Sequence, residues 1–294
     1  MIHTQHPGMT ENLSVHFSAD PDDAFAWWGA FEGRVDLTGM RFTGVAGNVH
    51  QNNLACRDEV PDIAAISSAS YPELASNYAV LSSGASVGRG YGPALIARVG
   101  VTLDEALGAP IAVAGLGTTG GTLLRVLYPK TEVVEIPWRK IPAAVASGRV
   151  GAGVAIHETL MLWRQAGLRR IACLGERWQT QTGHPLPMGL VVAHRRLGEP
   201  TLRLIADVLR RSVEAAFRNR TEAMNYAAQY SLTSDRSVTE RFVDSFTNSD
   251  TVDLPADACA GLDEFYRRMA TLGLCAMKPQ VDLIFPPSQK EMSA

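Results

Sequence analysis

The chain has 294 residues, of which 46% are hydrophobic and 19% charged, and its formal net charge is −3. A chain of this length can bury the core of one large domain or two medium domains. Because the charge is nearly balanced, we predict a small-molecule partner, with no nucleic acid and no membrane partner.

The cysteines and the N-terminal segment narrow the class of protein further. Cys56, Cys173, Cys259 and Cys275 lie far apart and form neither a zinc-ligand spacing nor a CxxC motif, so we interpret them as buried or unreactive thiols. The N-terminal segment has no basic start and no apolar run typical of a signal peptide, and no apolar stretch reaches the ~20 residues of a membrane-spanning helix. These features predict a cytoplasmic location.

Apolar periodicity and turn residues predict alternating strands and helices, followed by a helical C-terminal part. In chain order we expect a strand over 13–17, a helix over 24–31, a polar loop over 41–53, strands over 62–66, 78–82 and 93–98, a helix after Thr102, a strand over 111–114, a helix over 122–127, a strand over 132–136, a helix over 141–147, strands over 151–156 and 188–193, and helices over 200–218, 220–230, 237–246 and 256–272. Such alternation indicates parallel sheets, and the C-terminal helices are expected to form an amphipathic coat.

The loop between the first strand and the first helix carries Asp20, Pro21, Asp22 and Asp23. In open α/β sheets, loops at the carboxyl ends of strands bind ligands, because the amides of the following helix face an anion there. The alternative is a surface cap whose carboxylates stabilise the helix dipole.

Small hydroxyl side chains follow two further strands. Ser67 and Ser68 end the strand over 62–66, and Thr118 and Thr119 lie in the glycine-rich loop before the helix over 122–127. Hydroxyl groups and flexible backbone at a helix start suit a carboxylate ligand, although a purely structural capping turn remains the alternative for the threonines. The glycine-rich stretch over 84–92, which contains Arg89, matches neither a dinucleotide fingerprint nor a P-loop.

His157 and Glu158 follow the strand over 151–156. A histidine is often a hydrogen-bonded core residue, but one at a strand end beside an acid is also placed to act as a catalyst. At neutral pH an imidazole can accept a proton from carbon or oxygen and return it later, which is what a lyase needs.

Four segments in a fixed order, taken together, resemble one known family. They are Leu81-Ser82-Ser83-Gly84 through Gly88-Arg89-Gly90-Tyr91-Gly92-Pro93, then Ile141-Pro142, then 151–158 ending in His157-Glu158, then Thr182-Gly183-His184-Pro185-Leu186-Pro187-Met188-Gly189. This series is similar to that of 1,4-dihydroxy-6-naphthoate synthase, of the futalosine route to menaquinone.

The resemblance implies an α/β, two-lobed type II periplasmic-binding-protein-like fold with hinge crossings near 95–98 and 190–194. Lobe one would comprise residues 10–96 and 194–294, and lobe two residues 97–193. The family breaks a carbon–carbon bond of cyclic dehypoxanthinylfutalosine to leave 1,4-dihydroxy-6-naphthoate, and it needs no metal or organic cofactor. By position, His157 matches the proposed catalytic histidine, and Thr118, Thr119 and Ser67 match ligand-binding residues; we add Ser68, Asp20, Asp22, Arg89 and Glu158 as expected substrate contacts.

This chain departs from the family pattern where the substrate is expected. The usual Ser-Pro-Cys-Pro-Asn-Asp-Thr-Phe loop corresponds to residues 18–25, in which Asp20 and Asp22 replace a thiol and an amide. The amide-rich segment within 42–56 also differs, and Ala65 stands where a lysine is common. Since added carboxylates would repel an anionic ligand, we expect that the substrate has changed.

Several functions therefore remain open. The leading hypothesis is a cofactor-independent lyase acting on a small anionic organic substrate. One alternative is a divergent lyase or dehydratase for another aryl or sugar-derived carboxylate, and another is a non-catalytic solute-binding protein, because this fold also serves solute capture. The oligomeric state is undetermined, a homodimer being one arrangement.

Overall fold

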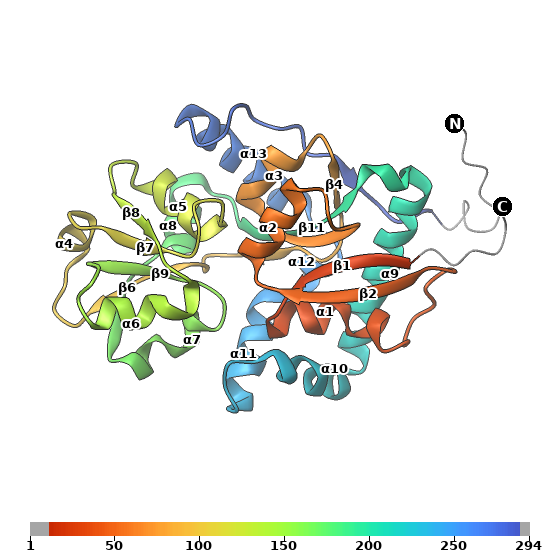
Figure 1. The fold of residues 1–294 in the computed structure, drawn as a ribbon, viewed down its shortest axis with the longest axis horizontal. Helices are drawn as coiled ribbons and strands as arrows, with labels where there is room; N and C mark the ends of the chain where they lie inside the picture. The colour runs from red at the N-terminus through yellow and green to blue at the C-terminus, as the bar shows by residue number, and fades with distance from the viewer. Residues whose placement is uncertain (1–11, 289–294) are drawn as a thin grey trace.

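In the computed structural model, which describes residues 12–288, the chain forms two α/β lobes that lie side by side (Figure 1). The strands of the first lobe are β1 (Asn12–Ser18), β2 (Arg41–Gly47), β3 (Ile63–Ser67), β4 (Tyr78–Leu81), β5 (Ser86–Gly88), β11 (Leu186–His194) and β12 (Leu283–Ile284). Those of the second lobe are β6 (Ala94–Arg98), β7 (Ile111–Val113), β8 (Val133–Glu135), β9 (Ala152–Ala155) and β10 (Leu168–Cys173). The first sheet has the order β12-β4-β11-β3-β1-β2, with β5 paired to β11, and the second has the order β10-β6-β9-β7-β8.

The helices surround these two sheets. The α-helices are α1 (Pro21–Phe31), α2 (Val49–Arg57), α3 (Tyr71–Leu74), α4 (Leu103–Leu107), α5 (Thr119–Leu127), α6 (Ile141–Ala146), α7 (Thr159–Leu162), α8 (Leu174–Thr182), α9 (Glu199–Arg218), α10 (Arg220–Ala227), α11 (Arg236–Phe246), α12 (Ser249–Val252) and α13 (Ala256–Thr271). Short 3₁₀ helices are η1 (Ser68–Ser70), η2 (Trp138–Lys140), η3 (Trp163–Ala166), η4 (Arg195–Leu197) and η5 (Ala228–Tyr230).

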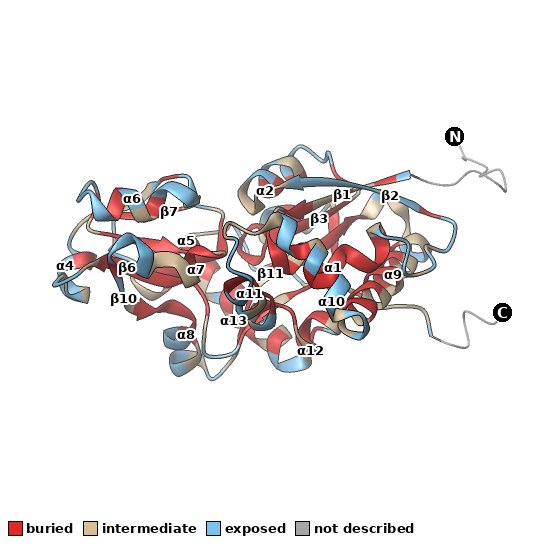
Figure 2. Cartoon of the chain, turned by 90° about the horizontal axis from the view of Figure 1, so that it is seen from below, coloured by how far each residue is buried: buried red, intermediate tan, exposed pale blue. Residues whose placement is uncertain are grey.

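The central strands of the first sheet are buried on both faces, and Figure 2 shows buried residues along the strands and on the inner sides of the helices. Side chains alternate across a strand. Ile63 of β3 accordingly packs in the cluster formed with α1 and α9, whereas Ile66 packs in the cluster formed with α13. This packing produces a two-lobed α/β fold, which confirms the fold expected from the sequence.

The polar loop expected over 41–53 is instead a strand and a helix. β2 pairs in parallel with β1 over seven residues, so its stability comes from backbone hydrogen bonding while most of its side chains are exposed. The side chain of Asn48 accepts the backbone N–H of Gln51, and the side chain of Gln51 accepts that of Asn48, which forms a capping box at the start of α2. Two of the amides that suggested a loop, those of Asn48 and Gln51, therefore cap a helix.

Two other expectations need correction. The sheets are mixed rather than parallel, because β11 runs antiparallel to β3 and β4, and β6 runs antiparallel to β9 and β10. The chain passes from the first sheet to the second between Gly88 and Ala94 and returns between Cys173 and Leu186, earlier in both cases than the hinge positions near 95–98 and 190–194. The physical reason is that β6 pairs with β9 from Ala94 onward and β11 pairs with β5 from Leu186 onward, so the expected hinge positions lie inside strands that already belong to the sheet they have entered. The division into domains stays a prediction.

Within residues 12–288, no helix combines the length and apolar composition needed to cross a membrane. The segment from which a cytoplasmic location was predicted, and the first two residues of the expected lobe one, lie outside these described residues.

Candidate active site

A pocket lies between the two lobes, with a cavity volume of about 110 Å³. The first lobe contributes the loop after β1, Ser67 and part of β11, and the second contributes the start of α5 and the residues after β9. This volume is smaller than the ~300 Å³ that ligand sites commonly enclose.

His157 and Asp20 meet in this pocket from opposite lobes. The Nδ1 atom of His157 lies 2.5 Å from the Oδ2 atom of Asp20, which also accepts the hydroxyl of Ser18 at 2.7 Å. Burial opposes ionisation of Asp20, but His157 and the hydrogen bonds around the carboxylate lower its pKa to about 2. With Nδ1–H donated to Asp20, the Nε2 atom remains to exchange a proton with a ligand.

The backbone of His157 is held in an unusual conformation. Its φ angle is +50°, a left-handed value that costs about 1 kcal/mol or more for a residue with a side chain. The imidazole also lies against the ring of Trp138, with 4.8 Å between the ring centroids. These contacts fix the imidazole at the pocket, so it is more than a core histidine.

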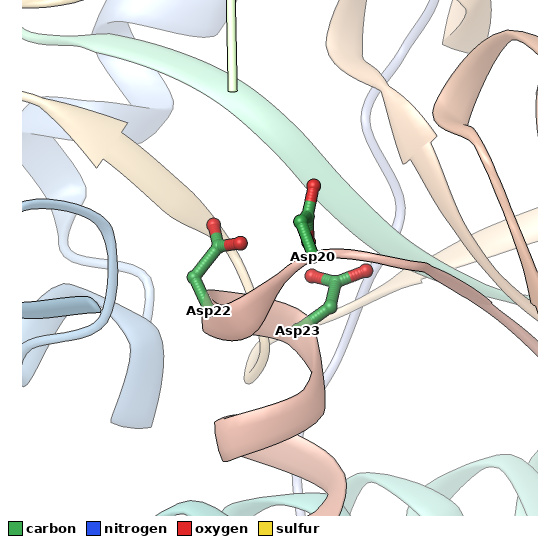
Figure 3. Close-up of side chains that lie close together, drawn as sticks. All are labelled: Asp20, Asp22 and Asp23. Carbon is green, nitrogen blue, oxygen red and sulfur yellow. The ribbon is translucent and has the colours of Figure 1, made fainter. Parts of the chain in front are cut away.

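Asp22 and Asp23 lie beside Asp20 at the start of α1 (Figure 3). Asp20 and Asp22 line the pocket, and Asp20 makes no side-chain capping bond to α1, which decides against the surface-cap alternative for this residue. Burial and the charge of Asp20 raise the pKa of Asp22 well above its usual value and that of Asp23 to about 8.

The three aspartates also bring one oxygen each within 4.8 Å of one another, the kind of grouping that can surround a metal ion. However, Asp20 is engaged by His157 and Ser18, and Asp23 accepts the backbone N–H of Ser18 at 2.7 Å. These bonds engage the Oδ2 atoms of Asp20 and Asp23, and the carboxyl groups are held by protein donors, so we assign no metal to the cluster.

Ser67, Thr118 and Thr119 also line the pocket, as expected. The hydroxyl of Thr118 accepts the N–H of Gly121 and donates to the carbonyl of Gly115, so the capping alternative is confirmed for this residue. The hydroxyl of Thr119 donates to the carbonyl of Met188 at 2.6 Å, across the lobes. Both hydroxyls are thus engaged within the protein. The group that this segment offers a ligand is the first turn of α5, whose backbone amides favour an anion.

Three expected substrate contacts are corrected, because their side chains lie outside the pocket lining. Arg89 pairs with Asp250 at 2.7 Å and with Asp257 at 2.7 Å. Ser68 is fully buried, and its carbonyl accepts the hydroxyl of Tyr266.

Glu158, the third of these residues, joins the lobes. Its carboxylate is 1% exposed and accepts the hydroxyl of Ser231 and the backbone N–H of Leu232, both at 2.6 Å. Ser231 and Leu232 precede α11, which packs on α1 and β5 of the first lobe. Glu158 therefore anchors the loop that carries His157 to the first lobe.

The amides expected near the ligand instead hold α2 in place. The side chain of Asn52 donates to the carbonyl of Ala65, and that of Asn53 accepts the backbone N–H of Ser67. The pocket is lined instead by apolar residues that the sequence analysis did not identify as site residues: Val49, Leu160, Met188, Phe242 and Phe246. The apolar spacing of Phe242 and Phe246 indicated only a buried helix face, so α11 was taken as part of a coat.

Similarity to solved structures defines the class of protein. An alkanesulfonate-binding protein from Xanthomonas axonopodis pv. citri superposes on this chain with a TM-score of 0.68 at 15% identity. The superposition covers 94% of this chain and 98% of that protein, which shows a periplasmic-binding-protein fold. A crystal structure of a protein from Archaeoglobus fulgidus superposes with a TM-score of 0.84 at 32% identity, covering 92% of this chain and 100% of that one.

The family follows from sequence similarity. The chain belongs to the menaquinone biosynthesis family, whose model matches residues 13–271. It is 31% identical to a 1,4-dihydroxy-6-naphtoate synthase of Streptomyces coelicolor, over 94% of this chain and 99% of that protein. A Thermus thermophilus protein with the same name is also 31% identical, over 92% of this chain and 98% of its own.

The anchoring role of Glu158 predicts a loss of stability in Glu158→Gln. The amide oxygen can accept only one of the two donors, so the Ser231 hydroxyl must turn to accept from the amide nitrogen, and the charge that strengthened both bonds is lost; we expect the free energy of unfolding to fall by about 1 kcal/mol. Urea denaturation of wild type, Glu158→Gln and the matched control Glu176→Gln, an exposed acid on α8, measures this. Equal midpoints for Glu158→Gln and the control would contradict the assignment.

The raised pKa of Asp23 predicts that stability falls as pH rises. The folded protein holds a proton on Asp23 between the unfolded pKa near ~4 and the folded pKa of about 8, so stability from this group is lost through that interval, by up to ~1.4 kcal/mol per pH unit. Asp22 acts in the same direction. Thermal unfolding from pH 5 to pH 8 should show a shallower decline in Asp23→Asn than in wild type, and parallel declines would contradict the pKa of Asp23.

Proposed function

We propose that this protein is a lyase of menaquinone biosynthesis that converts cyclic dehypoxanthinylfutalosine to 1,4-dihydroxy-6-naphthoate. The observation that carries the proposal is the imidazole of His157, held by Asp20 in a pocket between the lobes of a family member. The names of the relatives with 31% identity support the same reaction. We place this activity in the cytoplasm, on a small anionic substrate and without a nucleic-acid or membrane partner.

The arrangement supports acid–base chemistry in an enclosed site. Asp20 accepts the Nδ1–H of His157 and orients the ring, which leaves Nε2 to take a proton from the substrate and to return it after bond cleavage. The first turn of α5 faces the pocket and favours an anionic group, while Phe242, Phe246 and Met188 provide apolar walls for an aromatic ring. Closure of the lobes would exclude water and align the substrate with His157.

A lyase or dehydratase acting on a different carboxylate is a second candidate. The presence of the Asp20 carboxylate in the pocket lining favours it, because an ionised carboxylate would disfavour an anionic substrate there. The two candidates differ in kcat/KM for cyclic dehypoxanthinylfutalosine, which should be high for the first and very low for the second. Binding without turnover would instead indicate a solute-binding protein.

The acid–base role predicts a large loss of turnover in His157→Ala. Removing a general acid–base group should lower kcat by roughly 10²-fold to 10⁴-fold while ligand affinity stays near that of wild type. Product formation from cyclic dehypoxanthinylfutalosine and calorimetric binding measure the two quantities. His184→Ala is the control, since His184 lies outside the pocket lining. Turnover in His157→Ala equal to that of the control would remove His157 from the mechanism.

A further inference from the structure

The acidic cluster in the pocket contains more carboxyl groups than nearby positive charges. Asp20 is 4% exposed and Asp22 is 9% exposed, and Asp23 lies beside them. Among the described residues, the ion pair that reaches this cluster comes from His157, which contacts Asp20. Like charges this close in a buried site cannot all be ionised without a large electrostatic penalty, so at least one of these groups must be neutral.

Two buried oxygens identify where the proton resides. The Oδ2 atom of Asp20 accepts from Ser18 and contacts His157, and the Oδ2 atom of Asp22 accepts the hydroxyl of Ser86 at 3.3 Å. The Oδ1 atoms of both aspartates are buried and receive no donor. The two carboxyl groups are in hydrogen-bonding contact, which two ionised carboxylates cannot form because both are acceptors only, so one of the pair must hold a proton.

We propose that Asp22 is a neutral carboxylic acid that donates its proton to Asp20, and that it thereby controls the basicity of His157 through Asp20. Asp22 is then a positioning residue in a hydrogen-bonded series that runs from Asp22 to Asp20 to His157. The proton belongs on Asp22 because the His157 imidazole and Ser18 stabilise the charge of Asp20, whereas Asp22 has the Ser86 hydroxyl and the backbone N–H of Asp23 but no basic side chain. The catalytic consequence rests on the proposed function, but the protonation state does not.

The groups around Asp22 support a neutral acid. The titratable groups that face it are Asp20 and Asp23 from its own segment and, beyond Asp20, His157 from the second lobe. β5 contributes the uncharged Ser86, and α11 contributes Phe242 and Phe246 to the same pocket. The position of Asp22 in the first turn of α1 favours an ionised carboxylate, but burial and the charge of Asp20 both favour the neutral acid and outweigh this effect.

The first experiment measures protonation without any ligand. Infrared spectra of the free protein are compared between wild type, Asp22→Asn and the control Asp104→Asn, whose carboxyl is exposed on α4 at the far side of lobe two (Figure 1). At pH 7 the wild-type minus Asp22→Asn difference should contain a carbonyl band of a protonated carboxylic acid, and the control difference should contain a carboxylate band. A carboxylate band in the Asp22→Asn difference would overturn the proposal.

The second experiment tests the effect on His157. The amide of Asp22→Asn can donate the same hydrogen bond to Asp20 but cannot lose a proton, whereas Asp22→Leu can do neither. We expect kcat for cyclic dehypoxanthinylfutalosine in Asp22→Leu to fall at least ~10-fold below that in Asp22→Asn, with a smaller change in KM. Because wild-type Asp22 can lose its proton at high pH and the amide of Asp22→Asn cannot, we also expect kcat to decline at alkaline pH in wild type and to show no such decline in Asp22→Asn.

Two results of this second experiment would overturn the proposal: equal kcat in the Asn and Leu variants, or an unchanged alkaline decline in Asp22→Asn. If wild type shows no turnover of this substrate, the proposed function fails, and the infrared result decides the state of Asp22 by itself.

Discussion

The contact between Asp20 and His157 is the interaction on which the site depends. Each of these residues comes from a different lobe, and the carboxylate is almost completely buried. A buried carboxylate is unfavourable unless a cation or several hydrogen bonds stabilise it. The charge of Asp20 therefore favours the arrangement of the lobes in which His157 contacts it. The same contact orients the imidazole for the proton transfer proposed above, which links the association of the lobes to the assembly of the proposed catalytic group.

Glu158 extends this link by one residue. Because Glu158 bonds to the segment before α11 and His157 bonds to the loop before α1, two adjacent side chains attach lobe two to separate parts of lobe one. The left-handed backbone of His157 lies between these attachments and is stable only because the surrounding contacts determine it. Opening of the cleft would break these bonds together, so the site can exist in its active geometry only when the lobes are closed.

The sequence predicted strands and helices well where apolar periodicity was strong, and poorly where backbone or capping interactions dominate. β1, β3 and β9 were expected near their observed bounds because their buried residues are nearly continuous or alternate. β2 was missed because its exposed side chains carry no apolar pattern, and its partner, β1, supplies the stability. Strand ends correctly indicated His157, Asp20 and Thr119 as pocket residues. Arg89 and Glu158 instead form contacts with residues far away in the sequence, which hold their side chains outside the pocket lining. Local periodicity contains no information about such distant partners.

The same limit explains why the two added carboxyl groups were expected to repel an anionic substrate. That expectation assigns each aspartate the charge it has in water, whereas the charge in the pocket depends on burial and on neighbouring groups. Asp20 is held by the Nδ1–H of His157 and the hydroxyl of Ser18, which stabilise its charge within the protein, and Asp22 in the neutral form proposed above adds no charge. A protonated carboxyl group also has one donor and one acceptor, as a side-chain amide does in a single hydrogen-bonded pair. Replacement of an amide by Asp22 therefore changes the hydrogen-bonding pattern of the site little as long as the proton stays in place, and the anionic substrate expected for the family remains compatible with this pocket.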